Sequence, residues 1–91
     1  MPKIAIYKYL VFYIVSYDLG ERLHLHISNT KSRKGRDGKI WLDTFEVFEK
    51  GDLSNKEIAL CQELIKNNYE KIVSAIRKFA KGVKSKPINL V

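Results

Sequence analysis

The hydrophobic pattern of this chain changes its period near residue 50, and that change constrains the fold more than any other feature. Before it, apolar residues run continuously or alternate with polar ones, as in strands. After it, they recur every three or four residues, as in amphipathic helices. The sequence therefore predicts an α+β fold: an antiparallel β-meander of four to five strands, followed by two helices packed on one face.

The first half contains four strand-like segments and a shorter one. They are Lys3–Tyr7, Tyr9–Ser16, Arg22–Ser28, Lys39–Asp43 and Phe45–Glu49, of which the last either continues the fourth strand or forms a short fifth. The third segment alternates strictly between apolar and polar residues. Its leucines and isoleucine therefore share one face of the strand, and its two histidines share the other.

The second half carries two helix signals. Ser54 is a good N-cap residue, and Glu57 three positions later completes a capping box. Asn67 can cap a second helix, whose apolar positions recur at helical spacing until Gly82 ends it. The tail is expected to be extended, because Pro87 disfavours helix at the residue before it. We expect one domain over residues 1–91, with β-rich residues 1–50, helices over about 54–82 and a tail over 83–91.

Charge and cysteine content narrow the classes of partner and the cellular setting. The chain has 17 basic and 10 acidic residues, a net charge of +7. Such a surplus favours anionic partners, such as nucleic acid or an acidic protein, without choosing between them. The single cysteine, Cys61, excludes an intramolecular disulfide, so a reduced, cytoplasmic setting is expected. Its place in the apolar stripe of the first helix favours a small core residue over a reactive thiol.

The apolar run over Tyr9–Val15 raises the question of a membrane segment. A helix needs about 20 apolar residues to span a bilayer, so this run is too short. It also lacks a small-residue cleavage site, which argues against a signal peptide. We therefore expect no membrane partner.

Strand parity predicts which residues share a face with the histidines. If Arg22–Ser28 pairs with Lys39–Asp43 as an antiparallel hairpin, the apolar residues of both strands must lie on one side. The other side then carries His24, His26, Lys39, Trp41 and Asp43.

Parity alone leaves the register of this hairpin open. In the register that pairs Leu25 with Leu42, His24 lies opposite Asp43 and His26 lies opposite Trp41. Side chains that are directly opposed lie about 4.5–5.5 Å apart at Cβ, close enough to interact. This register would join a histidine to a carboxylate.

Two helices with one apolar stripe each can cover only one side of the sheet. The histidine side then stays uncovered, and the second strand adds Tyr9, Val11, Tyr13 and Val15 to it. An exposed face of aromatic and apolar residues is typical of an interface. A partner protein, a second copy of the chain or nucleic-acid bases stacked on Trp41 and the tyrosines would each satisfy it.

The same face offers candidate catalytic residues: His24, His26 and Asp43. A histidine near a carboxylate can act as a general base or acid in RNA cleavage, and the second histidine would supply the other proton transfer. A zinc site would need a third protein ligand, from Asp43 or Glu46. The close multi-ligand spacing of structural zinc sites is missing, so we expect no metal and no other cofactor.

A basic loop between the third and fourth strands suits phosphate contacts, which bind without reading sequence. Together with the neighbouring strand it supplies the candidate nucleic-acid-binding residues Lys31, Arg33, Lys34, Arg36, Lys39 and Trp41. The alternative is that the loop is solvated and binds no ligand, which is the usual role of a run of charged residues.

A family resemblance runs through nearly the whole chain. The segments "MPKIAIYKYLVFYIVSYD", "LHLHIS", "GKIWLD" and "LSNKEIALCQELIKNNYEKIVSAIRKFAKG" resemble, in this order, the bacterial domain-of-unknown-function 4160 family. The most specific element is the His-x-His at His24 and His26. The prolines usual before the first histidine are replaced here by Arg22 and Leu23, and the loop over residues 31–38 is longer and more basic.

The resemblance implies a small bacterial protein of unassigned activity, often encoded beside another small protein and suspected to belong to a toxin–antitoxin pair. It supplies no catalytic residues. Our leading hypothesis is a binding module that uses the face of His24, His26 and Trp41 for a partner protein and the basic loop for nucleic acid. The alternatives are a metal-independent ribonuclease that uses the His-x-His strand and a homodimeric structural protein.

Overall fold

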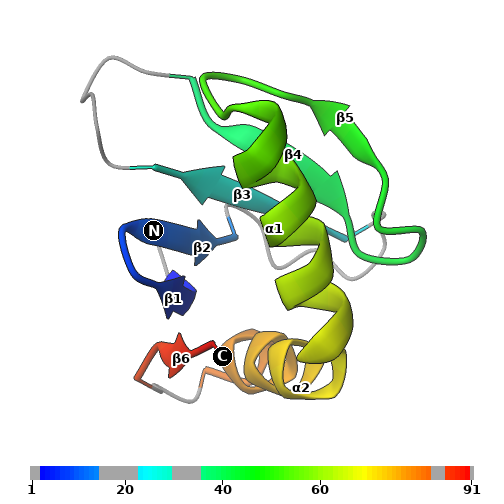
Figure 1. Cartoon of the computed structure of the whole chain (residues 1–91). Helices are drawn as coiled ribbons and strands as arrows, with labels where there is room; N and C mark the ends of the chain where they lie inside the picture. The colour runs from blue at the N-terminus through cyan, green and yellow to red at the C-terminus, as the bar shows by residue number, and fades with distance from the viewer. Residues whose placement is uncertain (1–2, 15–22, 30–35, 83–85, 91) are drawn as a thin grey trace.

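A computed structural model describes residues 3–14, 23–29, 36–82 and 86–90 of the chain. The elements are β1 (Lys3–Tyr7), β2 (Leu10–Tyr13), β3 (His24–Ser28), β4 (Gly38–Trp41), β5 (Val47–Glu49), α1 (Asn55–Asn67), α2 (Tyr69–Ala80) and β6 (Ile88–Asn89). The change of period near residue 50 is therefore the change from sheet to helices (Figure 1). This confirms the predicted α+β fold.

The strands form one sheet in the order β5-β4-β3-β2-β1-β6. Strands that follow one another from β1 to β5 pair antiparallel, as expected of a meander. The sheet has six strands in the described residues rather than four to five, because the tail returns as β6 and pairs parallel to β1. The extended form of the tail was predicted from Pro87. Its pairing with β1 was not predicted, because β6 is only two residues long and its sequence does not indicate which strand it joins.

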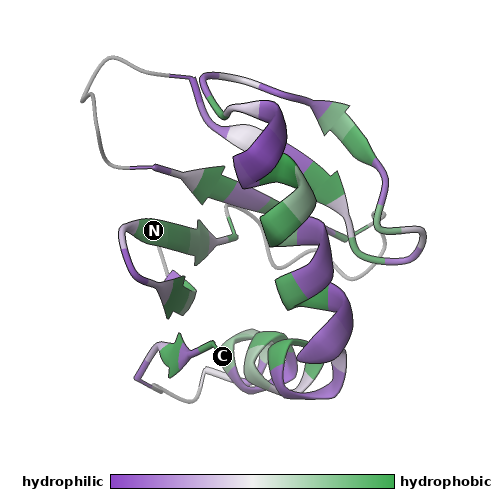
Figure 2. Ribbon diagram, in the orientation of Figure 1, coloured by the Kyte–Doolittle hydropathy of each residue, from purple (hydrophilic) through white to green (hydrophobic). Residues whose placement is uncertain are grey.

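Both helices lie on one face of the sheet. In Figure 1, α1 crosses β3 and β4, and α2 lies beside β1 and β6. Figure 2 shows β2 as almost wholly hydrophobic and the outer side of α1 as hydrophilic. The two amphipathic helices thus turn their apolar stripes to the sheet, as the sequence predicted.

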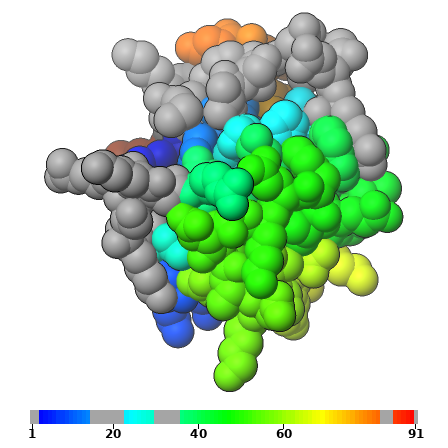
Figure 3. All heavy atoms as spheres, turned by 90° about the horizontal axis from the view of Figure 1, so that it is seen from above, coloured from blue at the N-terminus to red at the C-terminus, as the bar shows by residue number. Residues whose placement is uncertain are grey.

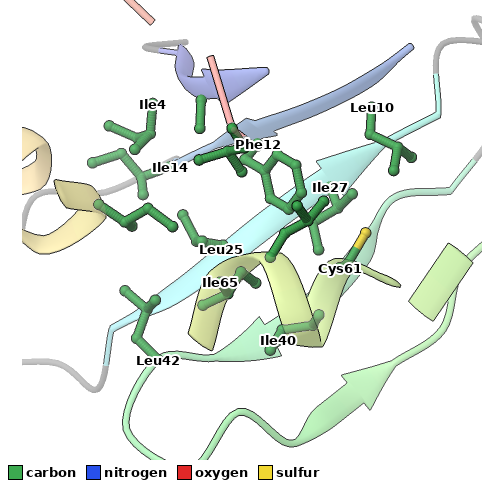
Figure 4. Close-up of a cluster of buried hydrophobic side chains, with 14 of the residues drawn as sticks. Ile4, Leu10, Phe12, Ile14, Leu25, Ile27, Ile40, Leu42, Cys61 and Ile65 are labelled. Atoms are coloured by element: carbon green, nitrogen blue, oxygen red, sulfur yellow. The ribbon is translucent and has the colours of Figure 1, made fainter. Parts of the chain in front are cut away.

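The core consists of apolar side chains from this covered face and from the two helices. Figure 4 shows Cys61 and Ile65 of α1 among the side chains of the central strands. The largest fully buried side chains are Phe12, Ile4, Leu10, Ile14, Leu25, Ile27, Ile40, Ile65, Ile72, Ile76 and Cys61. Burial raises the pKa of the Cys61 thiol to about 12, so the group is neutral near pH 7. Cys61 is a core residue, as its spacing predicted.

The start of α1 is fixed by the predicted capping box. The Glu57 backbone N–H donates to Ser54 Oγ at 3.1 Å, and the Ser54 backbone N–H donates to Glu57 Oε1 at 2.8 Å. The second carboxylate oxygen accepts a hydrogen bond of 2.8 Å from the Tyr9 hydroxyl. That bond raises the pKa of Tyr9. Glu57 therefore joins the β1–β2 turn to the first turn of α1.

The prediction that Asn67 caps the second helix is wrong by one position. Asn67 is the last residue of α1, and Asn68 stands between the two helices. The Asn68 side chain does not cap α2; its Nδ2 donates to the Leu64 carbonyl at 2.9 Å. The Leu64 carbonyl also accepts the Asn68 backbone N–H at 3.1 Å, so both the side chain and the main chain of Asn68 bind the C-terminal end of α1.

Candidate binding face

The register of β3 and β4 differs by two residues from the one that pairs Leu25 with Leu42. Leu25 pairs with Ile40, which places His24 opposite Trp41 and His26 opposite Lys39. The predicted face is right, since a shift of two residues keeps every side chain on its side of the sheet. The predicted opposition of His24 and Asp43 is wrong, because Asp43 lies two residues beyond the end of β4.

The two histidines contact each other instead. His24 Nε2 lies 3.1 Å from His26 Nε2, and both side chains are half-buried. One ring nitrogen must carry a hydrogen and the other a lone pair. Burial first, and then the neighbouring His24 and Lys39, lower the pKa of His26. The neutral form of His26 is therefore favoured near neutral pH.

Aromatic rings extend from this pair in a continuous series. Tyr13 stacks on His26 with ring centroids 5.3 Å apart, and His24 meets Trp41 edge to face at 5.4 Å. Phe48 stacks on Trp41 at 4.1 Å and also meets His24 at 5.4 Å. We name these five residues, Tyr13, His24, His26, Trp41 and Phe48, the ring platform.

Phe48 is the member that sequence reasoning missed. Lys39 pairs with Glu49 and Ile40 pairs with Val47, so Phe48 is an extra residue at an irregularity of the β4–β5 ladder. This places both Phe48 and Glu49 beside the residues of the histidine face. Alternation would put these two neighbours on opposite sides, and a bulge leaves no clear mark in the sequence. The predicted aromatic character of the face is nevertheless correct at Trp41 and Tyr13.

Tyr9 was also predicted on the histidine side, and that assignment is wrong. It lies in the turn between β1 and β2, after Lys8 with a φ of 53°. Its hydroxyl donates to Glu57 on α1, which packs on the other face. Turn residues do not follow strand parity, which explains the error.

Lys39 stands at the side of the ring platform. Its Nζ lies 2.9 Å from Glu49 Oε2, and both side chains are about one-third exposed, at 32% and 37%. The Lys39 ammonium lowers the pKa of the Glu49 carboxyl. Ion pairs with this exposure contribute about 0–1 kcal/mol, so the pair does not prevent Lys39 from meeting another anion.

The basic loop is held at its C-terminal end by Asp52. The Arg36 backbone N–H donates to Asp52 Oδ2 at 2.7 Å, and the Asp52 backbone N–H donates to the Arg36 carbonyl at 2.9 Å. At the other end of the loop, Asn29 Nδ2 donates to the Asp52 carbonyl at 3.5 Å. Three of the candidate residues, Lys31, Arg33 and Lys34, lie outside the described residues. The Arg36 side chain is exposed.

Acidic residues near the platform do not build a metal centre. Asp43 and Glu46 are both exposed, in the segment between β4 and β5. In the described part of the chain, no three or more residues among His, Cys, Asp and Glu gather where they could hold a metal ion. Of the residues considered for a metal site, His24 and His26 therefore contact each other, and neither Asp43 nor Glu46 forms a metal-binding group with them in the described part of the chain.

Seen from above, the segment from β4 to α1 forms most of the surface that is not grey (Figure 3).

Neither described helix has the length and apolar character needed to cross a membrane.

Comparison with known proteins identifies a family. The family model described as "Domain of unknown function (DUF4160)" matches residues 10–75, well over half of the chain. The match includes both histidines, Trp41 and Phe48. A search of the curated proteins found no match, and neither did a search of the solved structures.

Proposed function

Because the chain belongs to the family of the domain of unknown function DUF4160, whose description assigns no activity, we propose a function from the site itself: a module that binds single-stranded nucleic acid on the ring platform. The observation that carries this proposal is the series of rings on the sheet face opposite the helices. Bases stack on aromatic side chains whatever their sequence, with about 1–3 kcal/mol per base.

Exposure and charge support this ligand. Phe48 is 42% exposed, although it is a large apolar residue. Trp41 beneath it and His24 beside it extend the surface on which a base would lie. Lys39 and Arg36 carry positive charge near this surface, and the net charge of +7 attracts a phosphate backbone.

The experiment is a titration of the full chain with labelled single-stranded RNA and DNA, followed by anisotropy and by Trp41 fluorescence. Because Trp41 is the only tryptophan, stacking on the platform should quench the emission directly. Phe48→Ala should weaken binding about 5–150-fold, by loss of about 1–3 kcal/mol per stacked base. Affinity should also fall as salt rises, since phosphate contacts release counterions.

Tyr69→Ala is the matched control. The exposed fraction of Tyr69, 39%, is similar to that of Phe48. Tyr69 lies on α2, however, and contacts Phe45 rather than the platform. Its loss should leave affinity unchanged. Equal weakening by both substitutions, or no binding at low salt, would refute the proposal.

Phosphate contact by the basic loop is a separate part of the proposal. Changing Lys31, Arg33, Lys34 and Arg36 to serine should weaken binding and make it less dependent on salt. A chain that makes fewer phosphate contacts releases fewer counterions when it binds. An unchanged salt dependence would remove the loop from the binding site and leave the platform as the only candidate.

The contact between His24 and His26 favours a ribonuclease as the second candidate. Two imidazole groups in contact could supply the general base and the general acid that RNA cleavage requires. Asp43 remains a candidate for a supporting carboxylate. RNA cleavage that His24→Ala and His26→Ala each abolish would support this activity, whereas cleavage that survives both would exclude it.

The predicted small partner protein and the homodimer remain proposals for the same face. A partner encoded nearby, as a toxin–antitoxin pair would have, should compete with nucleic acid for the platform and protect Trp41 from quenching. Light scattering of the chain alone would test the homodimer. A dimer that persists in Phe48→Ala would exclude the platform as its interface.

A further inference from the structure

The contact between the two histidines has a geometry that nucleic-acid binding does not require. His24 and His26 stand two residues apart on β3, so their side chains project from the same face of one rigid strand. Their Nε2 atoms converge to 3.1 Å. Two imidazole nitrogens this close together on one strand can serve as the two ligands of a chelate.

The separation can be compared with the bond lengths of metal–imidazole complexes. Zinc–nitrogen bonds are about 2.0–2.1 Å long, so two nitrogens 3.1 Å apart would subtend an angle of about 100° at a shared metal ion. This angle lies between the right angle of tetragonal sites, which suit Cu²⁺ and Ni²⁺, and the tetrahedral angle of zinc sites. The distance between these two nitrogens therefore suits both classes of metal.

From this geometry we infer that His24 and His26 form a two-histidine site for a divalent transition-metal ion, with its remaining coordination positions open to water or to an external ligand. The inference is independent of the proposed function. The proposed site differs from a closed structural zinc site, which the sequence did not favour, because it needs no third protein ligand.

Binding requires little chemical rearrangement. Among neutral rings, one Nε2 carries a hydrogen and the other a lone pair. The first ring must move its hydrogen to Nδ1, after which both Nε2 lone pairs face the metal. The ion then replaces one hydrogen bond, and no proton is lost from either neutral ring.

The surroundings favour an ion that prefers nitrogen. The described neighbours of the pair include the rings of Tyr13 and Trp41, and Lys39 with its ion-paired partner Glu49. Hard ions such as Mg²⁺ require several oxygen ligands and should therefore bind weakly at this pair. Imidazole suits copper, nickel and zinc, and affinity should be highest for Cu²⁺.

The experiment is a titration of the metal-free full chain with Cu²⁺ at neutral pH. Trp41 reports binding, because its ring centroid lies 5.4 Å from that of His24 and bound Cu²⁺ quenches a nearby indole. We expect quenching that saturates at one ion per chain, and an electron paramagnetic resonance spectrum with couplings from two imidazole nitrogens. Zn²⁺ and Ni²⁺ should reverse the quenching by competition, and Mg²⁺ should not.

Substitutions test whether the two histidines are the ligands. His24→Gln and His26→Gln should each weaken Cu²⁺ binding by more than the roughly 10–100-fold that follows loss of an outer-shell partner. Glu46→Gln is the matched control, since it removes an exposed carboxylate near the platform and should leave affinity unchanged. Slow reaction of Cys61 with a thiol reagent verifies that each variant is folded.

Three results would overturn the inference. They are quenching that survives the double substitution of His24 and His26, quenching that does not saturate, and saturation at one ion per two chains with a dimer. The first two would indicate adventitious surface binding, and the third a closed site between copies. Loss of metal binding in a variant that still binds nucleic acid would separate this inference from the proposed function.

Discussion

The two faces of the sheet are made by the same strands but differ in chemistry. On the covered face, Leu25 and Ile27 of β3 are fully buried against the helices. On the other face, His24 and His26 of the same strand are half-buried and contact aromatic rings. The covered face therefore holds most of the buried core, and the other face holds the ring platform.

Phe12 and Phe48 give the sharpest test of this difference, with the largest expected effect. Phe12 is 0% exposed in the core, whereas Phe48 is 42% exposed on the platform. Phe12→Ala should reduce the free energy of unfolding by about 3–5 kcal/mol, through lost burial and the cavity left behind. Urea unfolding followed by circular dichroism measures the loss. A cost below that of Phe48→Ala would reverse the assignment of the two faces.

Cys61 probes the covered face by chemistry instead of stability. A pKa of about 12, against an ordinary value near 9, leaves about a thousandth of the usual thiolate at neutral pH. Reaction with a disulfide reagent should therefore be at least about a thousandfold slower in the native chain than in urea. Rapid labelling without urea would contradict the tight packing around α1.

The capping box at the start of α1 should have a smaller effect. Ser54→Ala removes the acceptor for the Glu57 backbone N–H and should cost about 1 kcal/mol in unfolding free energy. Ser54→Thr retains the hydroxyl and should cost less. Equal losses from the two substitutions would mean that the hydroxyl does not stabilise the helix end.

Phe48→Ala should have a smaller effect on stability than Phe12→Ala. Removal of a half-exposed ring loses its stacking with Trp41 and His24, worth about 0.5–1.5 kcal/mol for each aromatic pair. Thermal unfolding measures this change beside the binding titration. A loss as large as that of Phe12→Ala would make the platform a second core, and its proposed role in binding would fail.

The sequence predicted the features that depend on local pattern. The two periods, the capping box and strand parity were enough to place the helices, the buried side of β3 and the face of His24, His26 and Trp41. Each of these features involves residues close in sequence or a strict alternation, and a single pattern therefore specifies them.

The rest depends on how distant segments pair. A shift of two residues between β3 and β4 keeps every apolar residue buried, so the pattern could not exclude the register that joins His24 to Asp43. The irregularity that brings Phe48 to the platform and the pairing of β6 with β1 are likewise long-range features. The contact between the histidines depends on side-chain rotamers, which no sequence pattern encodes.

Asp52 has a consequence for how such a protein can diversify. Its main chain and carboxylate bind both Asn29 and Arg36, the residues that flank segment 30–35. A length change between two fixed points is inexpensive, since doubling a loop adds only about 0.6 kcal/mol of closure entropy. Insertions and charge substitutions between Asn29 and Arg36 should therefore change the stability of the sheet little, so related chains can differ in the length and charge of this segment while they keep the same fold.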